Sequence, residues 1–299
     1  MRLMTYGLPE GGERPAVVVG EAAVDLNDAL SAFHRTTDAP PPASIEALLA
    51  GGADALRAAD DAAAWAAAER PDLTRPLADL AFAPPVTRPE KIIGVGLNYR
   101  DHCAEIGRDI PTGIQTFGMF ANSLVGHGAP IRLNRESAMP DWEAELVIVI
   151  GTAGKHIPEA RAMEHVAGFT IGNDVSARDF QKADPQAMRG KSGDANSPLG
   201  PWIVTRDELP DDSDLAISLS VNGETKQASN TRERVFQTPA IVSFLSRFFT
   251  LKPGDLIFTG TPGGVGMGRD PQEWLQPGDQ VSITVAGIGV LSNPCEREP

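Results

Sequence analysis

The stretch of sequence that decides the fold spans residues 141–151 and reads DWEAELVIVIG. Its apolar part, residues 146–150, does not alternate with polar residues, so it predicts a strand that is buried on both faces. Glu143 and Glu145 stand where this strand begins. Because side chains two apart on a strand point to the same side, the two carboxylates are expected to project together.

A pair of carboxylates at the mouth of a buried strand predicts a cation site. Like charges in a partly dry environment repel each other, so either one takes a proton or a cation holds both. Asp174 ends the short apolar run at residues 168–174 and offers a third acid. A hard divalent cation prefers such oxygen ligands. The alternative is a solvated strand face, and Asp174 completes a site only if the two strands are neighbours.

The bulk composition excludes several classes of protein. The chain has 299 residues, of which 41% are hydrophobic and 22% charged, as is typical of a globular protein with an ample core. Its net charge of -14 argues against nucleic acid or an anionic membrane as a partner. Two cysteines provide neither a disulfide framework nor a thiolate metal cluster. With no apolar signal segment and no run of membrane-spanning length, we expect a cytoplasmic protein.

The pattern of strands and helices divides the chain into three parts. Residues 1–72 predict a small N-terminal α+β domain, and residues 73–90 form a Pro-rich linker. Residues 91–299 contain many short apolar strands separated by Gly and Pro. One strong helix interrupts them, with Thr238 as its expected N-cap and Phe248 on its apolar face. Strands without alternating helices predict a mixed, β-rich α+β fold.

Two further segments carry residue types suited to catalysis. His102 and Glu105 are three apart in a stretch expected to form a short helix. A carboxylate beside an imidazole orients it, and the pair can activate water as a general base, although a surface pair is the alternative. Lys191 lies in a Gly-flanked polar loop, where it is either solvated or held pointing into a site. The glycine run at residues 263–268 fits no nucleotide-binding motif and predicts a close approach of backbone.

Taken together and in order, these segments resemble the fumarylacetoacetate hydrolase family across residues 91–291. The motifs that carry the resemblance are GLNY at 96–99, DWEAEL at 141–146, NDVSARDFQ at 173–181, GKS at 190–192, PLGPW at 198–202 and TGTPGGVG at 259–266. The resemblance implies mixed β-sheets rolled into a barrel-like core, a small N-terminal domain and a homodimer.

The resemblance also implies roles for individual residues. It assigns a magnesium or manganese ion to Glu143, Glu145 and Asp174. It makes His102 and Glu105 the water-activating pair on a lid helix, and it gives Lys191 the task of stabilising developing negative charge. The remaining positions that it places at the substrate are Tyr99, Met119, Arg178, Gln181 and Thr261.

Two positions depart from the pattern of the family. Met119 stands where the family commonly has a lysine, which predicts substrates with an apolar distal end, because an apolar side chain cannot pair with a carboxylate. Gly193 stands where many relatives have a bulky residue, which predicts a wider pocket.

The activity that this resemblance implies is hydrolysis of a C–C bond in a 2,4-dioxo acid similar to an acylpyruvate or fumarylpyruvate. The metal acts as a Lewis acid, and an enolate bound to it is stabilised by Lys191. The same residues can serve a decarboxylase, a tautomerase or isomerase, or a lyase acting on a 2-oxo acid such as oxaloacetate. A third possibility is a metal-binding homologue without catalysis.

Overall fold

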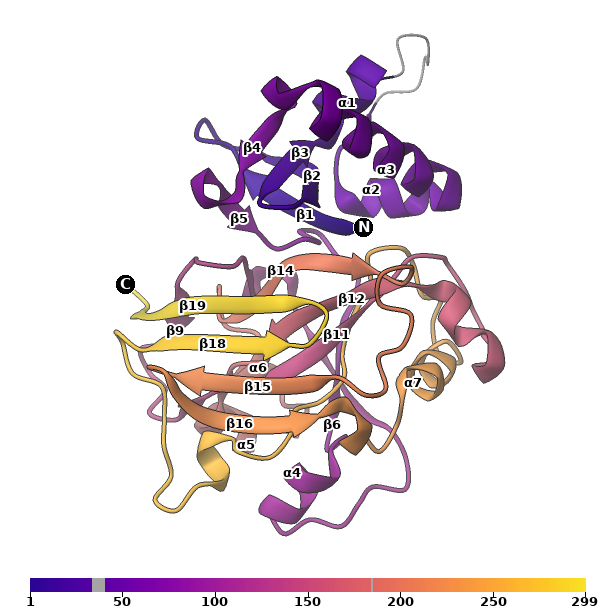
Figure 1. Cartoon of the computed structure of the whole chain (residues 1–299). Coiled ribbons are helices and arrows are strands. Elements are labelled where there is room, and N and C mark those ends of the chain that lie inside the picture. Colours follow the sequence, from indigo (N-terminus) through magenta and orange to yellow (C-terminus); the bar gives the residue numbers. More distant parts are fainter. Residues whose placement is uncertain (34–40, 184) are drawn as a thin grey trace.

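The computed structural model describes residues 1–33, 41–183 and 185–299. Within these ranges, twelve strands form one large sheet whose central path runs β4-β3-β2-β1-β14-β12-β11-β17-β6-β7, with β5 beside β1 and β8 beside β14 (Figure 1). The strands of this sheet are β1 (Arg2–Gly7), β2 (Glu13–Val19), β3 (Ala22–Asp25), β4 (Thr74–Pro76), β5 (Ala81–Ala83), β6 (Ile92–Gly96), β7 (Gln115–Met119), β8 (Leu124–Val125), β11 (Ala144–Ile150), β12 (Val166–Asn173), β14 (Ser197–Thr205) and β17 (Leu256–Phe258).

A second sheet of five strands, ordered β16-β15-β18-β19-β9, packs against the half of the first that contains β11 and β12. Its strands are β9 (Ile131–Leu133), β15 (Ala216–Val221), β16 (Glu224–Asn230), β18 (Gln280–Val285) and β19 (Gly289–Arg297). These findings confirm the expected β-rich α+β fold. The sheets do not close into a barrel, however, because the long path ends at β4 and β7, which do not pair with each other in the part described.

Strand β11 lies in the interior of the large sheet, between β12 and β17. Leu146 and Ile148 face the apolar cluster shared with the five-stranded sheet, whereas Val147 and Val149 face a second cluster shared with the N-terminal helices. Every residue of β11 is buried. The prediction of a strand covered on both faces is therefore confirmed.

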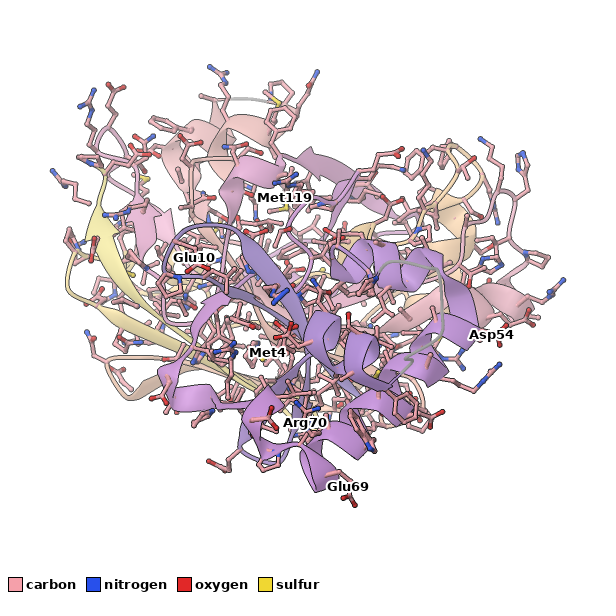
Figure 2. The ribbon with its side chains drawn as sticks, turned by 90° about the horizontal axis from the view of Figure 1, so that it is seen from above. Met4, Glu10, Asp54, Glu69, Arg70 and Met119 are labelled. Carbon is pink, nitrogen blue, oxygen red and sulfur yellow. The ribbon has the colours of Figure 1, made fainter. Side chains whose placement is uncertain are left out.

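The N-terminal strands extend the large sheet rather than forming one of their own. β1 pairs antiparallel with β14, with Arg2 opposite Val204 and Leu3 opposite Ile203. From the passage expected to be a linker, β4 pairs with β3 and β5 pairs with β1. Helices α1 (Leu26–Phe33), α2 (Ile45–Ala50) and α3 (Gly52–Glu69) pack on these strands. Figure 2 views the molecule from this end, with α3 marked by Asp54 and Glu69.

α3 shows how these surface helices are built. Its buried face consists of small residues, Ala59, Ala62, Ala63 and Ala66, and the opposite face carries charged side chains. No helix in the ranges described is long and apolar enough to cross a membrane.

Helix α7 (Thr238–Leu245) differs from expectation at both ends. Its N-cap is Gln237 rather than Thr238, whose hydroxyl instead donates to Asp212 Oδ2 at 2.5 Å. At the other end Phe248 lies beyond the helix and is 62% exposed, so it does not extend the buried face. The apolar periodicity predicted the helix itself. The N-cap lies one residue earlier than expected, because the Thr238 hydroxyl bonds to Asp212 instead of capping the helix.

Candidate metal and catalytic site

Strand pairing gathers the three acids that the sequence singled out. β11 and β12 are antiparallel neighbours, with Glu145 opposite Gly172. The Asp174 backbone N–H donates to the Glu143 carbonyl at 3.0 Å, which holds the ends of the two strands together. One carboxylate oxygen from each of Glu143, Glu145 and Asp174 lies within 4.8 Å of the others, and all three residues are buried. The strands that carry Glu145 and lead to Asp174 are thus neighbours, as the predicted cation site required.

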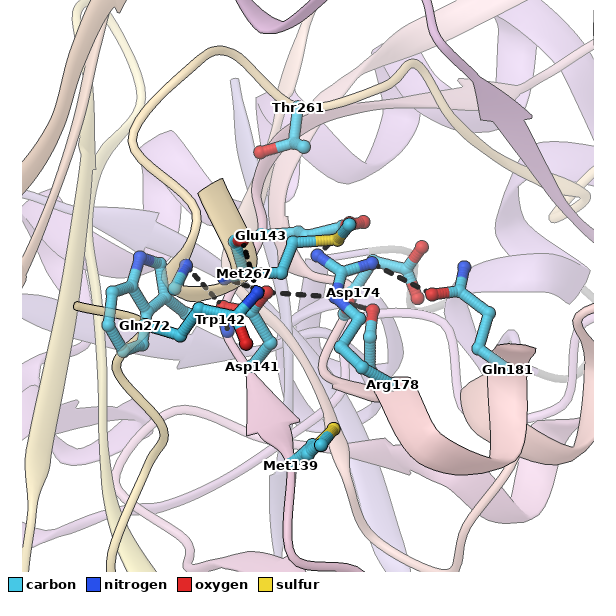
Figure 3. Close-up of polar contacts among 12 residues, drawn as sticks. Met139, Asp141, Trp142, Glu143, Asp174, Arg178, Gln181, Thr261, Met267 and Gln272 are labelled. Atoms are coloured by element: carbon cyan, nitrogen blue, oxygen red, sulfur yellow. Dashed lines mark hydrogen bonds and ion pairs between the residues drawn. The ribbon is translucent and has the colours of Figure 1, made fainter. Parts of the chain in front are cut away.

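Two buried cations face these acids. Lys191 ends α6 (Met188–Lys191), and its Nζ lies 2.7 Å from Glu143 Oε2 and 2.5 Å from Asp174 Oδ2. Arg178 begins α5 (Arg178–Lys182), and its Nη2 donates to Glu143 Oε1 at 2.7 Å (Figure 3). The Phe117 ring lies 5.1 Å from Lys191 Nζ and so covers the ammonium. Lys191 therefore points into the site, which is one of the two alternatives considered for it, although it ends a short helix rather than lying in the expected loop.

The cations divide the three acids electrostatically. Burial alone would raise the pKa of Glu143, but Lys191 and Arg178 outweigh it and lower that pKa to about 2. Burial raises the pKa of Asp174 to about 7, with Glu143 adding to the rise and Lys191 opposing it. Burial, Asp174 and Glu143 together raise the pKa of Glu145 well above its ordinary value. The positive charges nearby therefore do not compensate for the burial of Glu145 and Asp174, whose ionised forms are disfavoured.

The donor set fits a hard divalent cation. Asp174 Oδ1 is buried and has no hydrogen-bond partner among the residues described. Such an orphaned oxygen is costly unless a ligand occupies it. Three carboxylates within reach of one point are the ligands that magnesium and manganese prefer.

The glycine-rich loop after β17 supplies backbone donors to the site. The Gly260 N–H donates to Glu145 Oε2 at 2.7 Å, and the Gly264 N–H donates to Glu105 Oε1 at 2.8 Å. Thr261, which is 4% exposed, accepts at its hydroxyl from Gln227 Nε2. The close approach of backbone that the glycines predicted occurs here: at Gly268 an added Cβ would lie 2.5 Å from Glu105 Cδ.

The candidate dyad sits on α4 (Arg100–Glu105) at the edge of this site. His102 Nδ1 lies 3.3 Å from Glu105 Oε2, so the structure brings the two side chains together. The start of the helix is held both to the segment before α7 and to β16. Asn98 bonds to the backbone of Phe236, and Asp101 accepts from the Ser229 hydroxyl at 2.5 Å.

The remaining candidates for substrate contact lie at different depths. Gln181 is half-buried, and its Oε1 accepts from Arg178 Nη1 at 2.9 Å (Figure 3). Tyr99 is fully buried, and its hydroxyl has no hydrogen-bond partner in the part described. Met119 is 5% exposed and belongs to the apolar cluster that contains Val147. Burial of Tyr99 and Met119 means that a substrate reaches them only if neighbouring segments move.

Two buried residues of this region were not singled out from the sequence. Asp141 is fully buried and bonds to Arg178 Nε at 2.8 Å. Gln227 donates to Thr261 and accepts from the Ala144 N–H at 2.9 Å, which fixes the start of β11. The sequence could have indicated Asp141, because it is the first residue of the stretch 141–151 that contains Glu143 and Glu145. No such indication existed for Gln227, because it comes from a surface hairpin more than eighty residues away in the sequence.

Comparisons with known proteins agree with this architecture. Residues 91–296 match the family profile described as "Fumarylacetoacetate (FAA) hydrolase C-terminal". A mitochondrial oxaloacetate tautomerase of Rattus norvegicus is 42% identical over 298 residues, covering 98% of this chain and 91% of the relative.

Two solved structures extend the comparison to the whole chain. The fumarylacetoacetate hydrolase of Exiguobacterium antarcticum superposes with a TM-score of 0.82 at 32% identity, with both chains covered completely. A 5-carboxymethyl-2-hydroxymuconate delta-isomerase of Mycobacterium smegmatis gives a TM-score of 0.75 at 34% identity, again covering both chains. The chain therefore belongs to the fumarylacetoacetate hydrolase family.

Proposed function

We propose that this chain is a divalent-cation-dependent tautomerase that interconverts the keto and enol forms of a small 2-oxo acid of the oxaloacetate type. The observation that carries this proposal is the 42% identity, over 98% of the chain, to a protein named as an oxaloacetate tautomerase. The similarity to a delta-isomerase adds support, because that reaction also moves a proton along a carbon chain. The comparisons thus favour the tautomerase alternative over C–C bond hydrolysis.

The carboxylates would hold the cation that such a reaction needs. Glu143, Glu145 and Asp174 offer oxygen donors within 4.8 Å of one another, and we assign Mg²⁺ or Mn²⁺ to them. When bound, such an ion polarises the 2-oxo group as a Lewis acid. Lys191, which donates to Glu143 and Asp174, adds a fixed positive charge where the enolate oxygen becomes negative.

The dyad would move the proton. Tautomerisation transfers one proton between C3 and the oxygen on C2, and neither adds water nor breaks a C–C bond. Since Nδ1 of His102 lies 3.3 Å from Glu105 Oε2, we assign the ring proton to Nδ1, which leaves Nε2 as the base. The Gly264 N–H bond to Glu105 keeps that carboxylate in place. His102 Nε2 then accepts the proton from C3 and returns it to oxygen.

The experiment that tests this function follows the loss of enol absorbance of oxaloacetate, with magnesium, with manganese and after chelation. Cleavage of acetylpyruvate and decarboxylation of oxaloacetate are measured in parallel. We expect cation-dependent tautomerisation to be the fastest of the three. His102→Ala should lower its kcat by about 10²–10⁴-fold, as is usual when a general base is lost, while leaving cation affinity unchanged. Faster release of pyruvate from acetylpyruvate would establish hydrolysis instead.

Contacts to substrate, subunit number and cellular location remain predictions. We retain Tyr99, Met119, Arg178, Gln181 and Thr261 as proposed substrate contacts, of which Gln181 is the most accessible. The homodimer is tested by light scattering after gel filtration. The cytoplasmic location is tested by cell fractionation, since the relative from rat is described as mitochondrial.

A further inference from the structure

Asp141 is a buried carboxylate surrounded by donors. It ends the short strand β10 (Pro140–Asp141), which pairs with β13 (Ser176–Ala177) and so lies beside the start of α5. Its Oδ1 accepts from the backbone N–H groups of Trp142 at 2.8 Å and Gly266 at 2.6 Å. Its Oδ2 accepts from Arg178 Nε at 2.8 Å and from the Met267 N–H at 3.1 Å (Figure 3).

These bonds leave Asp141 no capacity for a ligand. A carboxylate has about four lone-pair sites, and four donors occupy them here. Asp141 is fully buried and is not one of the three acids whose oxygens converge. It therefore neither holds a cation nor exchanges a proton with substrate, so any effect on the reaction must pass through its partners.

Arg178 is the partner that reaches the cation site. Its guanidinium is planar, so fixing Nε also fixes the directions of both terminal nitrogens. With Nε on Asp141, Nη2 points to Glu143 Oε1 at 2.7 Å. Lys191 holds the other oxygen of Glu143 at 2.7 Å. The plane of the Glu143 carboxylate is thus set from two sides, one of which depends on Asp141.

The glycine-rich loop is the second partner. At Gly266 an added Cβ would lie 2.7 Å from Asp141 Oδ1 and 2.0 Å from the Glu273 carbonyl, so only glycine allows this approach. A few residues earlier, the same loop presents the Gly260 N–H to Glu145. Asp141 therefore anchors a segment that also orients a second candidate ligand.

We propose that Asp141 is a positioning residue for the cation site, acting through Arg178 and the loop to orient the carboxylates of Glu143 and Glu145. The inference rests on the cation site of the proposed function but not on the reaction assigned to it. It predicts that cation affinity depends on a side chain that never touches the cation.

The test measures the Kd for Mn²⁺ of the whole protein by calorimetry, beside its melting temperature. Asp141→Asn keeps the shape but places an amide NH₂ against two donors, so Arg178 or the loop loses an acceptor. We expect the Kd to rise about 10–100-fold, as when residues behind metal ligands are replaced. The matched control is Asp255→Asn. Asp255 is equally buried and accepts from the Lys91 and Lys252 N–H groups, but it stands before β17, at the end away from the site.

A second variant keeps the test decisive if Asp141→Asn does not fold. Arg178→Lys retains a positive charge but cannot hold Asp141 and Glu143 in a fixed fork, so its Kd should rise similarly. The double variant should lose less affinity than the two single losses combined, because the path through Arg178 is common to both substitutions and only the path through the loop belongs to Asp141 alone. Unchanged affinity in either folded single variant, a loss equal to that of Asp255→Asn, or independent losses in the double variant would overturn the proposal.

The assigned reaction and the positioning role of Asp141 can be tested separately. If the wild-type protein binds Mn²⁺ but does not accelerate tautomerisation, the assigned reaction is wrong, and the affinities still decide the role of Asp141. If the wild-type protein binds no divalent cation, the positioning role of Asp141 is overturned together with the cation site.

Discussion

Two buried charged clusters in this molecule are built on different principles. In the first, Arg234 donates through Nη2 to Asp212 Oδ2 at 2.7 Å, and its Nε donates to the Thr231 carbonyl. One positive charge meets one negative charge. In the second, Asp141, Glu143, Glu145 and Asp174 surround only Arg178 and Lys191, so four acids face two cations.

The difference is the one expected between an ion pair that serves the fold and a cluster proposed to bind a cation. Both clusters bear the cost of removing ions from water, but only the first cancels its charge internally. The second leaves Asp174 Oδ1 without a partner and raises the pKa of Glu145 through burial and its acidic neighbours. A fold gains nothing from such an imbalance by itself. It is understandable as a site that a further cation completes.

The largest effect is expected from breaking the balanced cluster. Asp212→Ala leaves the Arg234 guanidinium buried without its counter-ion, which should lower the free energy of unfolding by about 3–5 kcal/mol. Asp214→Ala is the control, because its pair with Arg232 is exposed and should be worth under about 1 kcal/mol. Urea denaturation measures both. Equal losses would mean that Asp212 and Arg234 do not form a closed unit.

The unbalanced cluster should respond in the opposite way. Glu145→Gln removes one of the repelling acids, so without a divalent cation its stability should stay within about 1 kcal/mol of the wild-type value. Its Kd for Mg²⁺ should rise by about 100-fold or more, since even residues behind the ligands are worth 10–100-fold. Calorimetry beside urea denaturation tests this. Undiminished affinity would remove Glu145 from the ligand set.

Adding the cation should stabilise one cluster and not the other. At a free Mg²⁺ concentration of 100 times the Kd, the wild-type protein should gain about 2.7 kcal/mol. Asp212→Ala should gain as much, because its defect lies elsewhere, and Glu145→Gln should gain little. Thermal melting with magnesium and with a chelator measures the gains. A shift of the same size in Glu145→Gln would place the cation at another position.

The smallest effect concerns Met119, which lies two residues from Phe117 on β7 and shares its apolar cluster. Met119→Lys should shift the ratio of kcat/KM toward oxaloacetate and away from 2-oxo acids with an apolar distal end. A charged hydrogen bond to the second carboxylate is worth roughly 1.5 kcal/mol, or about tenfold. Steady-state kinetics on both substrates measure the ratio. An unchanged ratio would show that Met119 serves only the core.

The sequence was sufficient where a local pattern determines the structure. The continuous apolar run at residues 146–150 predicted β11 with both faces covered. The expected convergence of Glu143 and Glu145 is also found, although Glu143 lies just before the strand. The spacing of His102 and Glu105 likewise predicted their contact.

The sequence was insufficient where contacts join distant segments. The bonds of Asp141 to Gly266 and Met267 cross about 125 residues, and nothing in either segment encodes the other. The same holds for the bond between Gln227 and the Ala144 N–H at the start of β11. It holds as well for Asp212, which accepts from the Thr238 hydroxyl, so that Thr238 does not cap α7. The open ends of the sheet were missed because barrel closure depends on which edge strands meet.

The pairing of β1 with β14 has a consequence for how the protein can be divided. A truncated chain beginning at residue 91 would retain the acids and the dyad, but β14 would become a free edge, with unpaired N–H and C=O groups beside Val204 and Ile203. Leu199 and Ile203 would also lose the apolar cover provided by the N-terminal helices. Exposed edges of this kind recruit other strands. Residues 91–296 are therefore a separate unit in the sequence comparison, but we expect them to aggregate when they are produced without the N-terminal strands.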